Sequence, residues 1–263
     1  MPLSAPLSPI ETLRARLATL QPQIGRGVWR FGDPRVDDCL PGGGLPRGVL
    51  HEIAAGGIEA ETAAVTAGFL ACLLTGLLAG LAPTGNIFWI APTTDLHPPG
   101  LLPYGLNPAR LIQIETRDDT ETLATLEAVL RSGSAAAAIG ETGRLGRIPA
   151  RRLQLACLKG GTTGFALRRW PYGKPAAGED PTAAVTRWDI APAPSAMPAP
   201  SGTSDRDPGP ARWRVTLVHA RGGIEGSWIM ESTASGDPHA PHPFRVVAEL
   251  APAQAAQSTR LVG

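Results

Sequence analysis

The sequence predicts an α/β fold in which a mostly parallel β-sheet carries helices on its faces, followed by a smaller β-rich extension. Short apolar runs that are typical of strands alternate with longer helical stretches between residues 49 and 170. The chain has 263 residues, and its 43% hydrophobic content is enough for one sizeable core with an appended subdomain. A Pro-rich stretch then separates this region from a later group of strand-like runs.

The first predicted element is an amphipathic helix at residues 8–21, within an N-terminal unit that covers residues 1–27. Ser8 can cap this helix, and Pro9 suits its first position. Its apolar stripe consists of Ile10, Leu13, Leu17 and Leu20. The stripe packs either on the chain's own core or on another protein, so Leu13 and Leu17 are candidate contact residues.

A core unit is expected over residues 28–170. The predicted strands are 49–54, 87–91, 110–115, 135–141 and 164–170, and the predicted helices are 62–81, 119–132 and 149–159. Residues 63–82 carry no charge and have Gly76 and Gly80 at a spacing found in membrane helices. A turn and a strand follow at once, which favours a buried crossover helix over a membrane span.

The remaining units differ in composition. Residues 171–211 are rich in proline and predict a long linker, interrupted by one candidate strand at 185–190. Residues 212–252 predict the β-rich extension, because Trp213, Val215 and Leu217 alternate along one strand and further strands follow at 227–231 and 244–250. The tail at 253–263 is expected to be loose.

Charge and cysteine content narrow the classes of function. With 24 basic and 23 acidic residues, the chain has no overall attraction to nucleic acid or to a membrane, so any basic surface is local. Cys39, Cys72 and Cys157 fit neither a disulfide framework nor a metal-ligand spacing, and His239 and His242 have no further ligands nearby. We expect a cytoplasmic protein without a bound metal, without a secretory signal and without a membrane partner.

A glycine-rich turn precedes the first strand of the core unit. Residues 40–53 read Leu-Pro-Gly-Gly-Gly-Leu-Pro-Arg-Gly-Val-Leu-His-Glu-Ile, and they follow Phe31-Gly32 and Val36-Asp37. This segment resembles the RecA/RadA family, in which such a turn leads into the strand before the phosphate-binding loop. The resemblance implies a RecA-like core with that loop at residues 55–62.

The loop at residues 55–62 lacks most of the residues that hold nucleotide. A working loop reads GxxxxGKS or GxxxxGKT, because backbone N–H groups surround the phosphates, lysine neutralises them and the hydroxyl binds magnesium. The eight positions here are Ala55, Gly56, Gly57, Ile58, Glu59, Ala60, Glu61 and Thr62. Alanines replace both glycines, Glu61 replaces the lysine, and only Thr62 keeps its role. Like charges about 4 Å apart repel by ~1 kcal/mol in water and ~4 kcal/mol near a protein surface, so we expect no nucleotide cofactor and no enzymatic activity.

Two more positions follow from the RecA-like pattern. Counting back from the turn at residues 104–106 puts Thr93 where the family has the carboxylate that activates water, with Asp95 two residues away. The strand at 135–140 delivers Glu141 to its tip, which is the Walker B position of the family. Glu141 is either a remnant of that site or a strand-end carboxylate facing solvent.

A local basic patch follows Glu141 and consists of Arg144, Arg147, Arg151 and Arg152. The resemblance to RecA proteins implies that this region matches their first DNA-contacting loop, so the patch is a candidate contact for DNA phosphates or for an acidic partner. The alternative is the solvated face of a helix whose core residues are Leu153, Leu155, Ala156 and Leu158. Trp213 and Trp228 are more typical of a core, although the two could anchor a partner.

The overall layout resembles the ImuA family of RecA-like accessory proteins. The matching segments are Phe31-Gly32, the glycine-rich turn, the degenerate loop, residues 151–156 and the late block at residues 212–229. The resemblance implies a non-catalytic role in the damage-induced (SOS) mutagenesis of bacterial lesion-bypass cassettes. Its implied partners are an ImuB-like Y-family protein, RecA and an error-prone DnaE-type polymerase at the nucleoid, with the helix at 8–21 and the strands at 212–250 as contact surfaces.

Two other functions remain open at this point. A SulA-like inhibitor of cell division also uses a stripped RecA-like fold, although such chains are usually shorter. A residual RecA-type ATPase would use Thr62 and Glu141. Direct DNA contact is also left open by the sequence.

Overall fold

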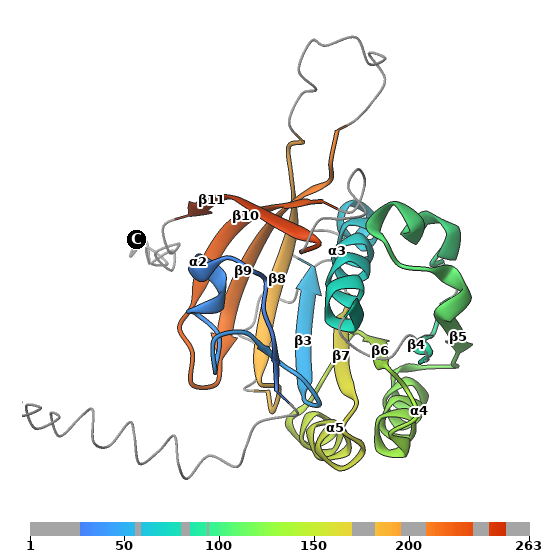
Figure 1. The fold of residues 1–263 in the computed structure, drawn as a ribbon. Coiled ribbons are helices and arrows are strands. Elements are labelled where there is room, and N and C mark those ends of the chain that lie inside the picture. The colour runs from blue at the N-terminus through green and yellow to red at the C-terminus, as the bar shows by residue number, and fades with distance from the viewer. Residues whose placement is uncertain are drawn as a thin grey trace, which may run out of the picture.

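The computed structural model describes residues 27–55, 59–79, 85–93, 95–169, 182–195, 209–233 and 242–250, with the backbone alone for residues 59–62. In these ranges the chain forms a nine-stranded mixed sheet and a small two-stranded one (Figure 1). The order in the large sheet is β11-β10-β9-β8-β3-β7-β6-β4-β5. Its strands are β3 (Leu50–Ala55), β4 (Ile87–Ala91), β5 (Leu111–Glu115), β6 (Ala137–Thr142), β7 (Thr163–Arg168), β8 (Thr186–Ala193), β9 (Arg212–Ala220), β10 (Gly226–Ser232) and β11 (Phe244–Leu250).

The six strands from β8 to β5 in this order are parallel, and β9, β10 and β11 continue the same sheet in antiparallel fashion. The small sheet pairs β1 (Val28–Trp29) with β2 (Leu45–Pro46). Sequence analysis did not predict this small sheet.

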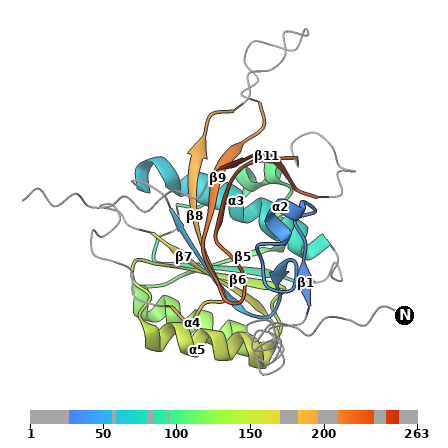
Figure 2. The ribbon, with the colours of Figure 1, turned by 90° about the vertical axis from the view of Figure 1, so that its left-hand side faces the viewer.

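Helices cover both faces of the parallel part (Figure 2). Helix α3 (Glu59–Ala79) packs on one face, and α4 (Asp119–Ser132) and α5 (Arg147–Gly160) pack on the other. Shorter helical segments are α2 (Pro34–Asp37), η1 (Pro98–Tyr104) and η2 (Pro108–Arg110). The predicted α/β class, with a mostly parallel sheet, flanking helices and a β-rich C-terminal part, is confirmed.

The small residues of α3 are explained by close packing against aromatic side chains. A Cβ added at Gly68 would lie 2.7 Å from the Tyr104 ring, and one at Gly76 would lie 2.4 Å from the Trp29 ring. The helix therefore buries its uncharged surface in the protein. Among the described residues, no helix has both the length and the apolar character needed to cross a membrane.

The antiparallel strands share their core with the α3 face of the parallel strands. Phe69 of α3, Trp213 of β9 and Phe244 of β11 make mutual ring contacts, with centroids 5.1–5.9 Å apart. The predicted extension thus continues the main sheet and its core. The predicted linker at 171–211 contains β8, which pairs with both β3 and β9. Val185, Trp188 and Ile190 give this segment a buried face, although the residues around it are rich in proline.

Candidate functional site

A pocket of about 630 Å³ lies at the carboxyl ends of β3, β6 and β7, beside the first half of α3. Its polar lining includes Thr66, Asp95, His97, Glu141 and Arg169. Ligands of open α/β sheets bind outside the carboxyl ends of parallel strands. This pocket is therefore where a RecA-like core would place its nucleotide.

On one side of the pocket the described backbone has a strand before residues 56–58 and a helix after them, which is the order of elements around a phosphate-binding loop. Strand β3 ends at Ala55 and α3 begins at Glu59, so Ala60, Glu61 and Thr62 belong to the first helical turn. Gly56 and Gly57 lie outside the described residues. The positive end of a helix dipole attracts phosphate in nucleotide-binding proteins, and it also attracts acidic residues in the first turn. In this chain the first turn contains Glu59 and Glu61.

Glu141 is buried at the end of β6, with its side chain only 5% exposed. The indole N–H of Trp89 donates to Glu141 Oε1 at 2.5 Å, and the Arg169 guanidinium donates to Oε2 at 2.5 Å. The alternative in which Glu141 faces solvent is therefore wrong. Both carboxylate oxygens are engaged by protein donors.

Arg169 follows the end of β7 and also binds Asp95. Its two terminal nitrogens donate to the Asp95 carboxylate at 2.9 and 2.7 Å, which is a two-point contact. The guanidinium thus joins a buried carboxylate to one whose side chain is 54% exposed. Inside the pocket, this arginine is a positive charge that is held by protein carboxylates.

The pKa values follow from this arrangement. The hydrogen bond from Arg169 lowers the pKa of Asp95 below its ordinary value. Burial raises the pKa of Glu141, against the opposing effects of Arg169 and Trp89. The hydrogen bond to Asp95 and the charge of Glu141 outweigh burial and raise the pKa of Arg169, so the arginine stays charged.

Sequence analysis missed Arg169. Asp95, Glu141 and Arg169 are far apart in the sequence, and only the parallel pairing of β4, β6 and β7 brings their segments together. The one available signal was an arginine pair, Arg168 and Arg169, inside the predicted strand at 164–170.

Thr93, the predicted position of the missing catalytic base, lies two residues before Asp95, which belongs to the ion pairs of Arg169. Thr93 is exposed just beyond the end of β4, and Asp95 is the nearby residue whose carboxylate reaches the pocket. That carboxylate is occupied by Arg169.

The four arginines of the basic patch divide into two groups. Arg152 forms an ion pair with α4, where its guanidinium lies 2.6 Å from the carboxylate of the buried Glu127. Arg144, Arg147 and Arg151 are exposed, as Arg152 is, but have no such ion pair in the described ranges. The helix they flank buries Leu153 and Ala156 as predicted, but the expectation that Leu155 and Leu158 belong to the core is wrong, because both point to the solvent side and are more than 40% exposed.

The remaining predicted contact residues are placed as follows. Trp213 and Trp228 are buried, and the indole N–H of Trp213 donates to the Val65 carbonyl, so neither side chain is accessible to a partner. Their hydrophobic surface completes the core between the sheet and α3. Leu13 and Leu17 lie outside the described residues.

The thiols and other metal-ligating groups form no site in the described part of the chain. Cys39, Cys72 and Cys157 are buried and unpaired, and burial raises the pKa of Cys72 and of Cys157 to about 12. No group of three His, Cys, Asp or Glu residues there could hold a metal ion.

Comparison with known proteins gives the following similarities. No protein-family model matches the chain. The chain is 45% identical to Protein ImuA of Caulobacter vibrioides strain NA1000 / CB15N over 228 residues, which cover 85% of this chain and 90% of the relative. Protein ImuA of strain ATCC 19089 / CIP 103742 / CB 15 gives the same values. Among solved structures, SulA from Pseudomonas aeruginosa aligns with a TM-score of 0.39 and 22% identity, covering 46% of this chain and 98% of that one.

Proposed function

Because the chain belongs to the ImuA family, we propose that it is a non-catalytic RecA-like accessory protein of damage-induced translesion DNA synthesis. It acts through contacts with an ImuB-like Y-family protein, and RecA and an error-prone DnaE-type polymerase are further partners. It works in the cytoplasm, at the nucleoid when engaged.

One observation carries the non-catalytic part of this proposal. The two oxygens of Glu141, the Walker B-like carboxylate, accept hydrogen bonds from Trp89 and Arg169. In a RecA-type enzyme the equivalent carboxylate serves the magnesium nucleotide. This arrangement, together with Glu61 in place of the lysine, disfavours the binding of a magnesium triphosphate.

Isothermal titration with Mg-ATP tests this part. The natural chain should show no binding at micromolar concentrations. The matched variant Ala55→Gly/Ala60→Gly/Glu61→Lys restores the loop pattern and should gain measurable affinity if the loop residues are the cause. Micromolar binding by the natural chain would overturn the non-catalytic proposal in favour of a residual ATPase.

A pull-down tests the part of the proposal that concerns partners. Deletion of residues 8–21 should weaken capture of the ImuB-like protein or of RecA, because the Leu13 and Leu17 stripe is the expected contact. The circular dichroism spectrum should keep the signature of the folded sheet. Deletion of residues 253–263 is the matched control, and unchanged capture after removal of the helix would refute its proposed role.

A further inference from the structure

Three large aliphatic side chains are exposed on α5. Ile148 is 77% exposed, Leu155 is 49% exposed and Leu158 is 43% exposed. They follow one another at spacings of seven and three residues, so they form a stripe along one side of the helix. The opposite side of the same helix already buries Leu153, Ala156 and Cys157 against the sheet. Helix α5 therefore has a second apolar side that the described fold leaves uncovered.

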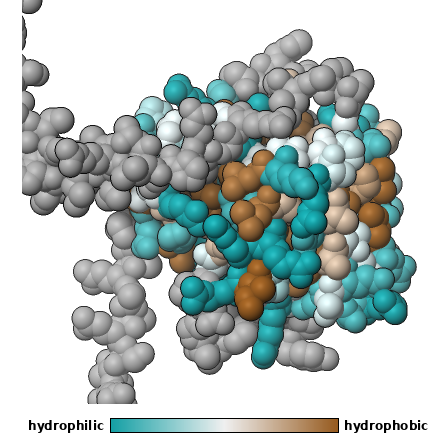
Figure 3. Space-filling model, turned by 90° about the horizontal axis from the view of Figure 1, so that it is seen from below, coloured by the Kyte–Doolittle hydropathy of each residue, from teal (hydrophilic) through white to brown (hydrophobic). Residues whose placement is uncertain are grey.

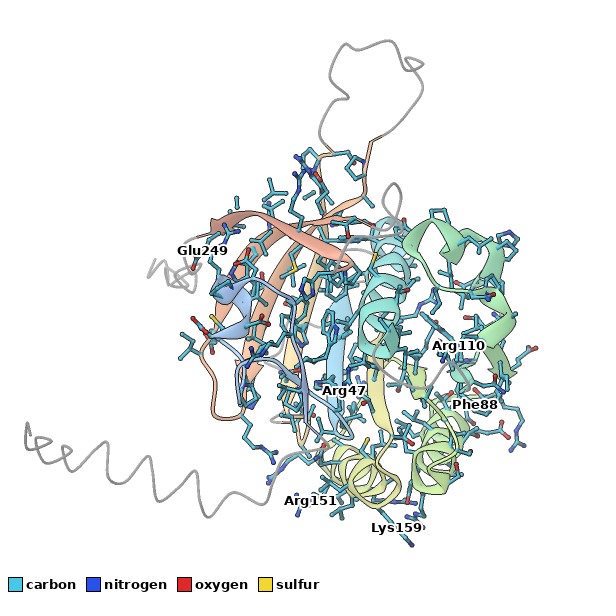
Figure 4. All side chains as sticks on the ribbon, in the orientation of Figure 1. Arg47, Phe88, Arg110, Arg151, Lys159 and Glu249 are labelled. Atoms are coloured by element: carbon cyan, nitrogen blue, oxygen red, sulfur yellow. The ribbon has the colours of Figure 1, made fainter. Side chains whose placement is uncertain are left out.

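Basic side chains flank this stripe. Arg147, Arg151 and Lys159 are exposed, and none of them forms an ion pair with a carboxylate in the described ranges. Figure 4 shows Arg151 and Lys159 pointing away from the body of the protein. We call these three cations and the three aliphatic residues the α5 face. Seen from below, hydrophobic groups lie among hydrophilic ones on this side of the molecule (Figure 3).

A hollow of about 970 Å³ opens beside the first turns of α5. Its lining includes Arg147, Ile148, Arg151 and Ala183. Ile148 is the one stripe residue that lines this hollow, so the concavity lies at the first turns of the α5 face, next to Arg147 and Arg151, where it suits a side chain of a docked helix.

The composition of the α5 face favours a protein over a nucleic acid. Binding to single strands relies on aromatic side chains that stack on bases, and the six residues of the face include none. Phosphate contacts would use the arginines but would leave the three aliphatic side chains in water. The predicted helix at residues 8–21 is a poor occupant, because its Arg14 and Arg16 repeat the charge of the face.

We propose that the α5 face is a docking site for an acidic amphipathic helix of a partner protein. Leucine or isoleucine side chains of that helix pack on Ile148, Leu155 and Leu158, and its carboxylates pair with Arg147, Arg151 and Lys159. The identification of this partner with the ImuB-like protein rests on the proposed function, whereas the chemistry of the site does not.

The test uses a synthetic helical peptide of about 18 residues, long enough to span the 14 residues of α5. It carries leucines on one stripe and glutamates beside them, and a matched peptide carries lysines in place of the glutamates. Fluorescence anisotropy with the full chain should show binding of the acidic peptide alone. Leu155→Ser/Leu158→Ser and Arg147→Glu/Arg151→Glu should each weaken it by about tenfold or more.

Matched controls use exposed residues on other elements. Leu102→Ser and Ile224→Ser remove exposed aliphatic groups elsewhere, and Arg30→Glu reverses an exposed charge near β1, so none should change the binding. All variants should keep the melting temperature of the natural chain. Failure of the acidic peptide to bind, or equal loss in the controls, would overturn the proposal.

The same variants separate the possible occupants. If they reduce pull-down of the ImuB-like protein, this partner uses the α5 face. If they leave that pull-down intact while the peptide result holds, the docking site stands and another partner occupies it. If the variants instead abolish binding of a labelled oligonucleotide and the peptide does not bind, the face is a nucleic-acid contact and the proposal is wrong. Self-association that is lost in both variants, without peptide binding, would assign the face to a second copy of the chain.

Discussion

Arg169 is the residue on which the charges of the pocket depend. It neutralises Glu141, whose side chain is 5% exposed, and it also binds Asp95 at the rim. Removing one partner of a buried ion pair leaves the other charge buried without compensation, which costs far more than the pair itself contributes. Loss of the Arg169 guanidinium should therefore cost far more stability than loss of the exposed Asp95 charge.

Arg169→Ala should lower the free energy of unfolding by about 3–5 kcal/mol, because Glu141 then keeps only the Trp89 hydrogen bond. Asp95→Asn is the matched change at the exposed end of the cluster and should cost less than about 1 kcal/mol. Urea unfolding followed by tryptophan fluorescence measures both. Equal losses for the two variants would contradict the assignment of Glu141 as the buried partner.

His51 is fully buried in β3, and its hydrogen bonds fix its tautomer. Nε2 lies 2.9 Å from the Pro46 carbonyl, which can only accept, so this nitrogen carries the proton. Burial lowers the pKa of His51 from 6.5 to about 4, so the ring is neutral near pH 7. With the proton of the neutral ring on Nε2, Nδ1 accepts from the Thr186 hydroxyl at 2.7 Å, and the oxygen of that hydroxyl accepts from the Trp188 indole N–H.

This pKa predicts a dependence of stability on pH. Below pH 6.5 the unfolded chain binds a proton at His51 that the folded chain does not bind, so stability falls as the pH is lowered from 6.5 to about 4. The loss for this group reaches about 3 kcal/mol. The urea midpoint should drop between pH 6.5 and pH 5 in the natural chain and drop less in His51→Gln. Parallel curves for the two proteins would show that His51 does not titrate as described.

At the level of elements, α4 and α5 are joined by a close backbone approach. A Cβ added at Gly160 would lie 2.0 Å from the Leu130 carbonyl oxygen, which is backbone and cannot move aside. The Arg152–Glu127 ion pair links the same two helices. The spacing of the two helices therefore depends on the absence of a side chain at one residue.

Gly160→Ala should destabilise the protein by about 1–3 kcal/mol through this overlap. Gly100→Ala is the control, because a Cβ there meets only the His97 ring at 3.7 Å and should change stability by less than about 0.5 kcal/mol. Thermal unfolding followed by circular dichroism compares the two. A smaller loss for Gly160→Ala than for its control would contradict the described packing.

Elements with local signals were predictable from the sequence. Helix α4 has the bounds that were predicted, because Asp118 caps its start and Gly133 ends it with a φ of 71°. The candidate strand at 185–190 corresponds to β8, but it was placed within a linker, since its pairing with β3 involves residues more than 130 positions apart. The outward position of Leu155 and Leu158 could not be predicted, because an apolar residue in a helix is assigned to a core unless the packing is known.

For the whole molecule, the continuous sheet argues for one cooperative unit. Phe31 from the N-terminal segment contacts Trp188 of β8 and Phe244 of β11, with ring centroids 5.9 and 5.7 Å apart. Residues from both ends of the described chain thus complete the same core. Removal of the antiparallel strands would expose the core side chains that these strands cover.

The full chain should therefore unfold in one transition, whereas a fragment that ends at residue 195 should show none. Without β9, β10 and β11, the fragment lacks Trp213, Trp228 and Phe244 and exposes the apolar groups they cover. Calorimetry and limited proteolysis of the two proteins make the comparison. A fragment that melts cooperatively would show that residues 212–250 form a separate unit.

The position of β3 in the sheet determines when the protein can fold during its synthesis. Both neighbours of this strand, β7 and β8, come more than a hundred residues later in the chain. At roughly 5–20 residues per second, the ribosome exposes β3 for about 6–20 seconds before either neighbour emerges. The six residues of this strand, all buried in the folded protein, thus stay without their neighbouring strands until translation has passed β7 and β8, so the sheet forms late in synthesis.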